Sequence, residues 1–441
     1  MISASKHIVT HKNSLEESNR RRIAKDVALI KKAIWAYFLL LIFEGALRKW
    51  ILPALSGPLL IVRDPVAIYL IVKAFQTGLW KPNFFTILIW ALTMLGFTTA
   101  LMFGHGSIPV ALYGMRITFF HFPLLFIIGQ FYTKEDVIHV CKTMLYITIF
   151  MTVLIAAQFY SPQSAWINKG VGGVEGSGFS GALEFYRVPG TFSFTNGLGL
   201  FYGFAAACVF YFWADENTKV SKGLLIASTV ALMAAIPLSI SRSVFFEVIL
   251  SAVFMLIVSG KNPQLIKSIF TGAIGMTVLF LILSTFSFFQ TASGALDARF
   301  SAASQSEGGL EGTLGDRFLG GLYGAVTDDN ASFIGYGIGL GTNAGAQILG
   351  KKGFLISEGE WGRLIGEMGF IMGMIFIIVR LSIAFGLMSG GWKSASYKNI
   401  LPWMLLSNGF LLLVQGQWAQ PTALGFSVLV SGLIIASLSK K

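Results

Sequence analysis

The strongest constraint in this sequence is a succession of apolar stretches of about 20 residues, the length that an α-helix needs to cross a bilayer. Of the 441 residues 54% are hydrophobic and only 12% are charged, whereas soluble domains carry about 25% charged residues. We therefore predict an all-α polytopic membrane protein with about 12 transmembrane helices. The predicted spans are residues 33–52, 57–77, 83–103, 108–131, 138–160, 193–213, 223–241, 244–260, 264–288, 361–385, 399–417 and 420–437.

The distribution of lysine supports this even number of spans. When successive connectors alternate between the two sides, the lysines at helix ends collect on the side of the amino terminus. Cytoplasmic loops carry an excess of Lys and Arg, so both termini are expected in the cytoplasm. The polar, basic leader, residues 1–32, is too long for a cleavable signal peptide. The sequence has no internal repeat or linker, so residues 33–441 are expected to form one integral membrane domain.

The composition also excludes several functional classes. A formal net charge of +12 would suggest a nucleic-acid partner in a soluble chain, but here the basic residues lie at helix ends, where they set the topology. The cysteines, Cys141 and Cys208, fall in or beside predicted membrane helices and are interpreted as apolar packing residues. No cluster of His, Cys and Asp predicts a metal site. The lipid bilayer is the one partner that composition alone predicts.

Two long polar segments, residues 161–192 and 289–360, fall on the side opposite the basic connectors. Within the second segment, the glycine-rich run Phe333–Gly345 resembles a phosphate-binding loop, but it is not a G-x-G-x-x-G motif between a strand and a helix. We interpret this run as a turn that lets backbones approach closely. The chemistry is expected in the larger segment and at the arginines near it.

Arginines on the same side are candidate anion-binding residues. An arginine at bilayer depth costs about 2.5–3.5 kcal/mol on insertion scales and usually faces a cavity or a charged partner. A guanidinium suits phosphate because it offers fixed, bidentate donors and keeps its charge when buried. The candidates are Arg116, Arg187, Arg242, Arg317 and Arg363.

Internal ion pairs are the alternative for some arginines. Three pairs are visible in the sequence: Glu44–Arg48 and Arg363–Glu367 at the i,i+4 spacing of a helix, and Arg63 beside Asp64. We therefore favour structural pairing for Arg48 and Arg63. Arg242 has no acidic residue three or four positions away, and we favour substrate binding for Arg187 and Arg242.

Several short motifs resemble, in order and spacing, those of the bacterial O-antigen ligase, O-antigen polymerase and exopolysaccharide polymerase superfamily. They are Arg187–Gly199 (RVPGTFSFTNGLG), Ser239–Arg242 (SISR), Arg317, Phe333–Gly339 (FIGYGIG), Glu358–Trp361 (EGEW) and Glu367–Gly369 (EMG). The resemblance covers residues 185–385 by motif and the remainder by helix pattern. It implies an inner-membrane enzyme with the membrane-embedded C-type glycosyltransferase fold and a large periplasmic loop. Such enzymes join sugar chains delivered on undecaprenyl pyrophosphate.

The resemblance also implies roles for individual residues. An acceptor hydroxyl must lose its proton while a lipid pyrophosphate leaves, so the site needs one base and several fixed cations. Glu358 or Glu360 is expected to be the base. The candidate arginines, with Asn196, are expected to hold the substrate, and Trp361 is expected either to stack on a sugar or to lie at the membrane interface. No cofactor is expected, because the donor arrives already activated.

One position departs from the family pattern. Ligases of this superfamily typically carry a histidine where this chain has Glu358, and residues 289–360 contain no histidine. We therefore favour a polymerase over a ligase. His121 lies on an apolar helix and is interpreted as a hydrogen-bonded core residue. A transporter or lipid-sugar flippase with about twelve helices and a noncatalytic assembly partner remain alternatives.

Overall fold

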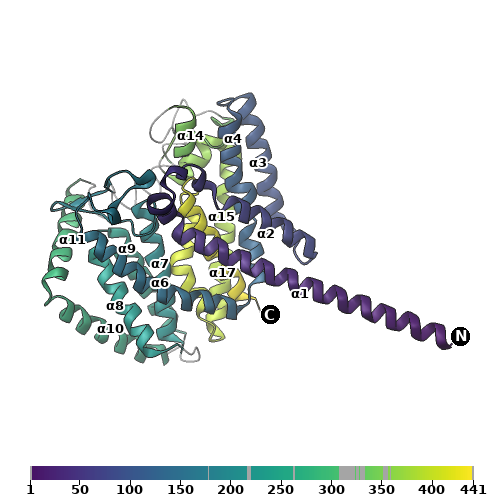
Figure 1. The fold of residues 1–441 in the computed structure, drawn as a ribbon, viewed down its shortest axis with the longest axis horizontal. Helices are drawn as coiled ribbons and strands as arrows, with labels where there is room; N and C mark the ends of the chain where they lie inside the picture. The colour runs from purple at the N-terminus through teal and green to yellow at the C-terminus, as the bar shows by residue number, and fades with distance from the viewer. Residues whose placement is uncertain are drawn as a thin grey trace.

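The computed structural model describes residues 2–176, 178–215, 220–261, 264–306, 323, 327, 333–350, 356–357 and 359–439. These residues form a helical bundle with a two-stranded antiparallel ribbon at one side (Figure 1). The α-helices are α1 (Ile2–Ala46), α2 (Asp64–Thr77), α3 (Phe84–Met102), α4 (Ile108–Arg116), α5 (Leu124–Phe131), α6 (Lys134–Tyr160), α7 (Thr195–Ala214), α8 (Lys222–Leu238), α9 (Arg242–Ser259), α10 (Gln264–Leu283), α11 (Ser287–Ser306), α14 (Asn343–Ile348), α15 (Glu360–Ser396), α16 (Leu401–Gln415) and α17 (Pro421–Leu438). The ribbon and the short helical turns are β1 (Ser180–Ala182), β2 (Phe185–Tyr186), η1 (Leu47–Ile51), η2 (Pro53–Leu55), η3 (Pro58–Ile61), η4 (Ile117–His121), η5 (Trp166–Asn168) and η6 (Val171–Gly173).

In the part of the chain that the structure describes, seven helical stretches are long and apolar enough to cross a membrane. An eighth candidate is the pair Ile274–Leu283 and Ser287–Ala302, which bends by 104°. The structure thus confirms the all-α membrane class. The other predicted spans fall on α1 with η1, α2, α8 and α16, which are shorter or more polar. The count of twelve therefore stays a prediction.

Helices α7 and α17 lie at the centre of the bundle because they are apolar on nearly every face. Most of their residues are buried, and α17 runs between α7 and α15 (Figure 1). Glycine allows the closest helix contact: a Cβ built on Gly432 of α17 would lie 2.6 Å from the Cβ of Ile128 on α5. Small residues therefore set the spacing of the central helices, as is common in membrane bundles.

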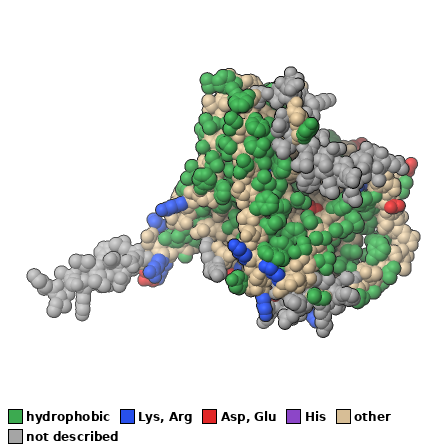
Figure 2. Space-filling model, turned by 180° about the vertical axis from the view of Figure 1, so that it is seen from behind, with side chains coloured by type: hydrophobic (Ala, Val, Ile, Leu, Met, Phe, Trp, Pro, Cys, Tyr) green, Lys and Arg blue, Asp and Glu red, His purple; other side chains and the backbone are tan. Residues whose placement is uncertain are grey.

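The two ends of the bundle differ in chemistry. Lysines stand where α6 and α8 begin and where α9 and α15 end, namely Lys134, Lys222, Lys261 and Lys393. We call this the basic end, and we call the opposite end, where the segments 47–63, 161–194 and 333–350 lie, the loop end. Figure 2 shows Lys and Arg side chains at the lower edge and on the projecting helix, with a broad apolar surface above them. This distribution agrees with a bundle that lies in a bilayer.

The basic leader predicted over residues 1–32 belongs to a long helix. α1 continues from Ile2 into the first predicted span without a break and projects from the bundle (Figure 1). Lys31 forms an ion pair with Asp136 of α6 at 2.6 Å, and Asp26 forms one with Lys73 of α2 at 3.1 Å. These pairs fix the direction in which α1 enters the bundle, so that it ends in η1 at the loop end.

The polar segment predicted over residues 289–360 begins with a helix. α11 follows α10 after the 104° bend and contacts α8, α9 and β1. Phe289, Ala292 and Ala295 are buried, and their spacing of three residues is that of one face of an amphipathic helix. The segment is therefore not all loop, and its first part is a helix packed on α8 and α9 at the loop end.

Candidate functional site

Three arginines from distant parts of the chain meet at the loop end. Arg187 follows β2, Arg242 is the first residue of α9, and Arg299 lies on α11. Phe300, beside Arg299, packs on Phe245 of α9 with ring centroids 5.5 Å apart, and α11 also contacts β1. These contacts place the Arg187 guanidinium within electrostatic range of both Arg242 and Arg299. We call Arg187, Arg242 and Arg299 the arginine cluster.

In this cluster, the pKa of Arg187 is shifted by its surroundings. Burial lowers the pKa of its guanidinium, and the charges of Arg299 and Arg242 lower that pKa further. Among the described residues, its buried Nε atom has no hydrogen-bond partner. A bound anion would offset the repulsion between the like charges and accept the unused N–H. The geometry thus suits a phosphate or another small anion.

Sequence reasoning found Arg187 and Arg242 but missed Arg299. Arg299 lies in a segment that was predicted as loop, whereas the structure makes it part of α11. The spacing of Ala292 and Ala295 was the available signal, because Arg299 follows Ala295 by four positions and so lies on the same helical face. The nearest acidic residue before Arg187 in the sequence is Glu184, which is exposed in the β1–β2 turn and is not among the charges that shift the pKa of Arg187.

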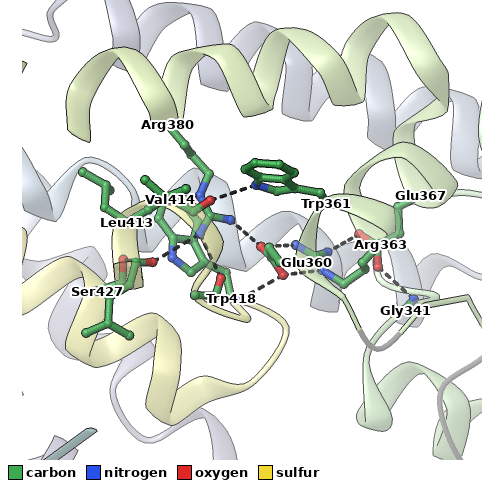
Figure 3. A network of polar contacts seen from close by, with 12 residues as sticks. Gly341, Glu360, Trp361, Arg363, Glu367, Arg380, Leu413, Val414, Trp418 and Ser427 are labelled. Carbon is green, nitrogen blue, oxygen red and sulfur yellow. Dashed lines mark hydrogen bonds and ion pairs between the residues drawn. The ribbon is translucent and has the colours of Figure 1, made fainter. Parts of the chain in front are cut away.

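A second polar group surrounds the start of α15, shown in Figure 3. The Glu360 carboxylate accepts hydrogen bonds from Arg363 at 2.9 Å, from Arg380 at 2.6 Å and from the Trp418 backbone N–H at 3.2 Å. Arg363 also pairs with Glu367. Arg380 is completely buried and stacks on the Trp418 ring, with its guanidinium carbon 4.1 Å from the ring centroid. We call Glu360, Arg363, Glu367 and Arg380 the α15 network.

The α15 network has the features of a structural unit. The i,i+4 pairing of Arg363 with Glu367, considered as an alternative to substrate binding, is confirmed. Glu360 is 3% exposed, and two guanidinium groups and one N–H already occupy its oxygens, so the geometry favours an ion-pair role over that of a base. The Trp361 indole N–H donates to the Val414 carbonyl at 2.9 Å, which fixes its ring against α16.

The α15 network also anchors the glycine-rich run Phe333–Gly345. Glu367 accepts a hydrogen bond from the Gly341 backbone N–H at 2.8 Å (Figure 3). Gly339 has a φ of 91°, and a Cβ there would lie 2.1 Å from the Val110 carbonyl oxygen of α4. Only glycine can adopt this conformation at such close range without strain. The interpretation of this run as a turn with close backbone approach is therefore confirmed.

Arg116 belongs to a third buried group, between α1, α2 and α4. It forms an ion pair with Asp64 at 2.7 Å and a hydrogen bond to the Tyr113 hydroxyl at 3.1 Å. His121 lies between Asp64 and the Tyr37 hydroxyl, 2.9 Å from each, so its interpretation as a hydrogen-bonded core residue is confirmed. The carboxylate beside Arg116 leaves it less suited than the arginine cluster to hold an added anion.

Two further arginines pair with one carboxylate in this region. Glu44 lies 3.6 Å from Arg48 and 3.2 Å from Arg63. The i,i+4 pairing of Glu44 with Arg48 is thus confirmed, whereas Arg63 pairs with Glu44 across two elements instead of with Asp64 beside it. Side chains of adjacent residues in a helical conformation point in different directions. The position of Asp64 next to Arg63 in the sequence therefore did not identify the ion-pair partner of Arg63.

Of the remaining predicted site residues, the structure describes Asn196 but not Glu358 or Arg317. Asn196 is exposed and donates to the Gln420 side chain at 3.0 Å. Glu358 and Arg317 lie outside the described residues. Groups of His, Cys, Asp and Glu that could hold a metal ion are not found in the described ranges.

Comparisons with known proteins add no further assignment. No family model, no curated protein and no solved structure matches this chain. The motif resemblance to polysaccharide polymerases and ligases therefore remains a prediction, and the geometry of the described residues carries the functional argument.

Proposed function

We propose that the protein is a bacterial surface polysaccharide polymerase. In this proposal it joins oligosaccharide units carried on undecaprenyl pyrophosphate, at the periplasmic face of the inner membrane. The supporting observation is the arginine cluster, since Arg242 and Arg299 lie within electrostatic range of the half-buried Arg187, whose Nε is unsatisfied among the described residues. A lipid pyrophosphate is an anion that reaches such a site from the bilayer, and guanidinium groups bind it through paired N–H donors.

The proposed reaction is a single glycosyl transfer. An acceptor hydroxyl attacks the anomeric carbon of the donor, a new C–O bond forms, and the C–O bond to the pyrophosphate breaks. Negative charge then grows on the leaving pyrophosphate, where the arginine cluster stabilises it. The base that takes the hydroxyl proton is assigned to Glu358, because Glu360 is held in the α15 network. Arg317 is the further candidate for a contact with the donor.

The two ends of the bundle support the proposed orientation. α9 begins with Arg242 at the loop end and is followed by Lys261 at the basic end. Lysine-rich connectors are retained in the cytoplasm, so the arginine cluster is assigned to the periplasmic side and both termini to the cytoplasm. Lipid-linked sugar units would then reach the cluster from the outer leaflet.

The test is a reconstituted chain-extension assay. The purified protein in proteoliposomes receives a defined lipid-linked oligosaccharide, and the products are separated by length. The proposal predicts a ladder of longer glycans that still carry one lipid. Transfer only to a different acceptor lipid would indicate a ligase, and movement of the substrate across the bilayer without extension would indicate a flippase. Neither extension nor movement would indicate a noncatalytic assembly partner.

A further inference from the structure

Lys49, in η1 at the end of α1, is a buried lysine with an unusual partner. Its side chain is 1% exposed, and its Nζ donates to the Gly190 carbonyl at 2.6 Å. The Trp50 ring lies on its other side, 4.5 Å from Nζ. In the described part of the chain the neighbouring Arg48 pairs with Glu44, whereas the acceptor of Lys49 is a backbone carbonyl and not a carboxylate. Burial of an ammonium group is costly, and an apolar side chain would occupy this position at a lower free-energy cost. The presence of a lysine therefore indicates that its hydrogen bond to Gly190 has a role.

Gly190 is the centre of a turn that two side chains fix. Its φ is 59°, and a Cβ there would lie 2.7 Å from the Met151 sulfur. Gln158 of α6 accepts the Gly190 N–H at 2.9 Å and donates to its carbonyl at 3.3 Å. Together with Lys49, these bonds satisfy both backbone groups of Gly190. The turn is therefore held from α6 on one side and from η1 on the other.

The residues after Gly190 are also bound to the end of α1. Thr191 donates to the Ile42 carbonyl at 2.6 Å, and Arg48 donates to the Ser193 hydroxyl at 3.0 Å. A Cβ on Gly45 would lie 2.4 Å from the Ser193 backbone nitrogen, so the two backbones touch. The segment is thus packed on α1 without space for an independent movement.

Arg187 lies three residues before Gly190 on this fixed segment. Val188 and Pro189, between them, are buried, which leaves the backbone little freedom to absorb a shift of the turn. We propose that Lys49 is a positioning residue for Arg187. By holding the Gly190 carbonyl, it keeps the Arg187 guanidinium within electrostatic range of Arg242 and Arg299, at the proposed pyrophosphate site. This inference rests on the proposed function of the arginine cluster.

The test is a double-mutant cycle with farnesyl pyrophosphate as the probe. Its affinity is measured in detergent for the parent protein, Lys49→Met, Arg187→Gln and the double variant. Arg187→Gln removes charged donors to the probe, and loss of a hydrogen bond to a charged group corresponds to about a tenfold change in affinity or more. Lys49→Met displaces the same guanidinium, so it should weaken binding by an amount that does not exceed the loss in Arg187→Gln. Because Lys49 acts through Arg187, the double variant should bind no more weakly than Arg187→Gln alone.

Matched controls separate positioning from folding. Lys73→Met removes a lysine that pairs with Asp26 near the basic end, and it should leave the affinity unchanged. If Lys49→Met does not fold, Gln158→Leu perturbs the same turn from α6 and should reproduce the non-additive loss.

The outcomes distinguish the inference from the function on which it rests. Losses that multiply in the double variant, or a lower melting temperature of Lys49→Met with parental affinity, would overturn the positioning role alone. Parental affinity in Arg187→Gln would overturn the proposed function of the cluster, and the positioning role with it.

Discussion

The replacement Glu360→Gln should lower the stability of the fold and leave turnover in the folded protein unchanged. Glu360 is the only carboxylate within ion-pair distance of Arg380 in the described part of the chain, at 2.6 Å. Arg363 would keep Glu367 as a partner, but Arg380 would lose its carboxylate and keep only uncharged acceptors, the new amide oxygen and backbone carbonyls, in a completely buried site. Breaking one side of a buried ion pair costs about 3–5 kcal/mol, and we expect a destabilisation of about that size.

The assay is thermal unfolding of the purified protein in detergent, together with chain extension at a temperature where the variant is folded. Glu360→Gln should unfold at a lower temperature and retain turnover. The double change Glu360→Gln with Arg380→Met removes both buried charges, so it should recover part of the lost stability. In contrast, Glu358→Gln should keep the parental unfolding temperature and lower turnover by about 100-fold or more, because general-base assistance contributes about that much. A Glu360→Gln variant with parental stability and greatly reduced turnover would refute this account of the α15 network.

Further predictions concern the arginine cluster, the glycine-rich turn and the topology. Arg187→Lys and Arg242→Lys keep the charge but lose the bidentate fork, so each should lower chain extension strongly while the protein remains in the membrane; near-normal product from both would demote these arginines to structural roles. Gly339→Ala, with φ at 91° and a Cβ 2.1 Å from the Val110 carbonyl, should destabilise the fold by about 1–3 kcal/mol, and an unchanged unfolding temperature would contradict the packing described. A cysteine in place of the exposed Glu184 should react with an impermeant thiol reagent in intact spheroplasts, whereas labelling only after lysis would reverse the orientation.

Local spacing in the sequence predicted those contacts that lie within one helix or one turn. The Glu44–Arg48 and Arg363–Glu367 pairs follow from the i,i+4 geometry of a helix and occur in the structure. The conformation of the run at Gly339 follows from the need for positive φ. The two ion pairs join residues that are close in sequence, so no knowledge of helix packing was necessary for them, whereas the contact of Gly339 with Val110 of α4 joins distant residues and was not predicted.

Contacts between distant residues escaped prediction for the opposite reason. Glu360 and Arg380 are twenty positions apart on α15. The backbone at Gly369, with φ 76° and ψ 169°, interrupts the regular helix between them, so helical spacing does not predict that these two residues share a face. Arg299 reaches the arginine cluster only because α11 turns by 104° away from α10. The direction of a bend depends on which helices pack on either side of it, and a single sequence does not contain that information.

The measurement that tests the central claim most directly is the release of undecaprenyl pyrophosphate during chain extension. Each glycosidic bond formed by the proposed reaction frees one lipid pyrophosphate, so the two products should accumulate in equal amounts. Both should fall together in an Arg187→Gln variant that remains folded, because the arginine cluster stabilises the leaving group. Glycan extension without release of the lipid pyrophosphate, or equal release by the parent and the variant, would contradict the proposed role of the cluster.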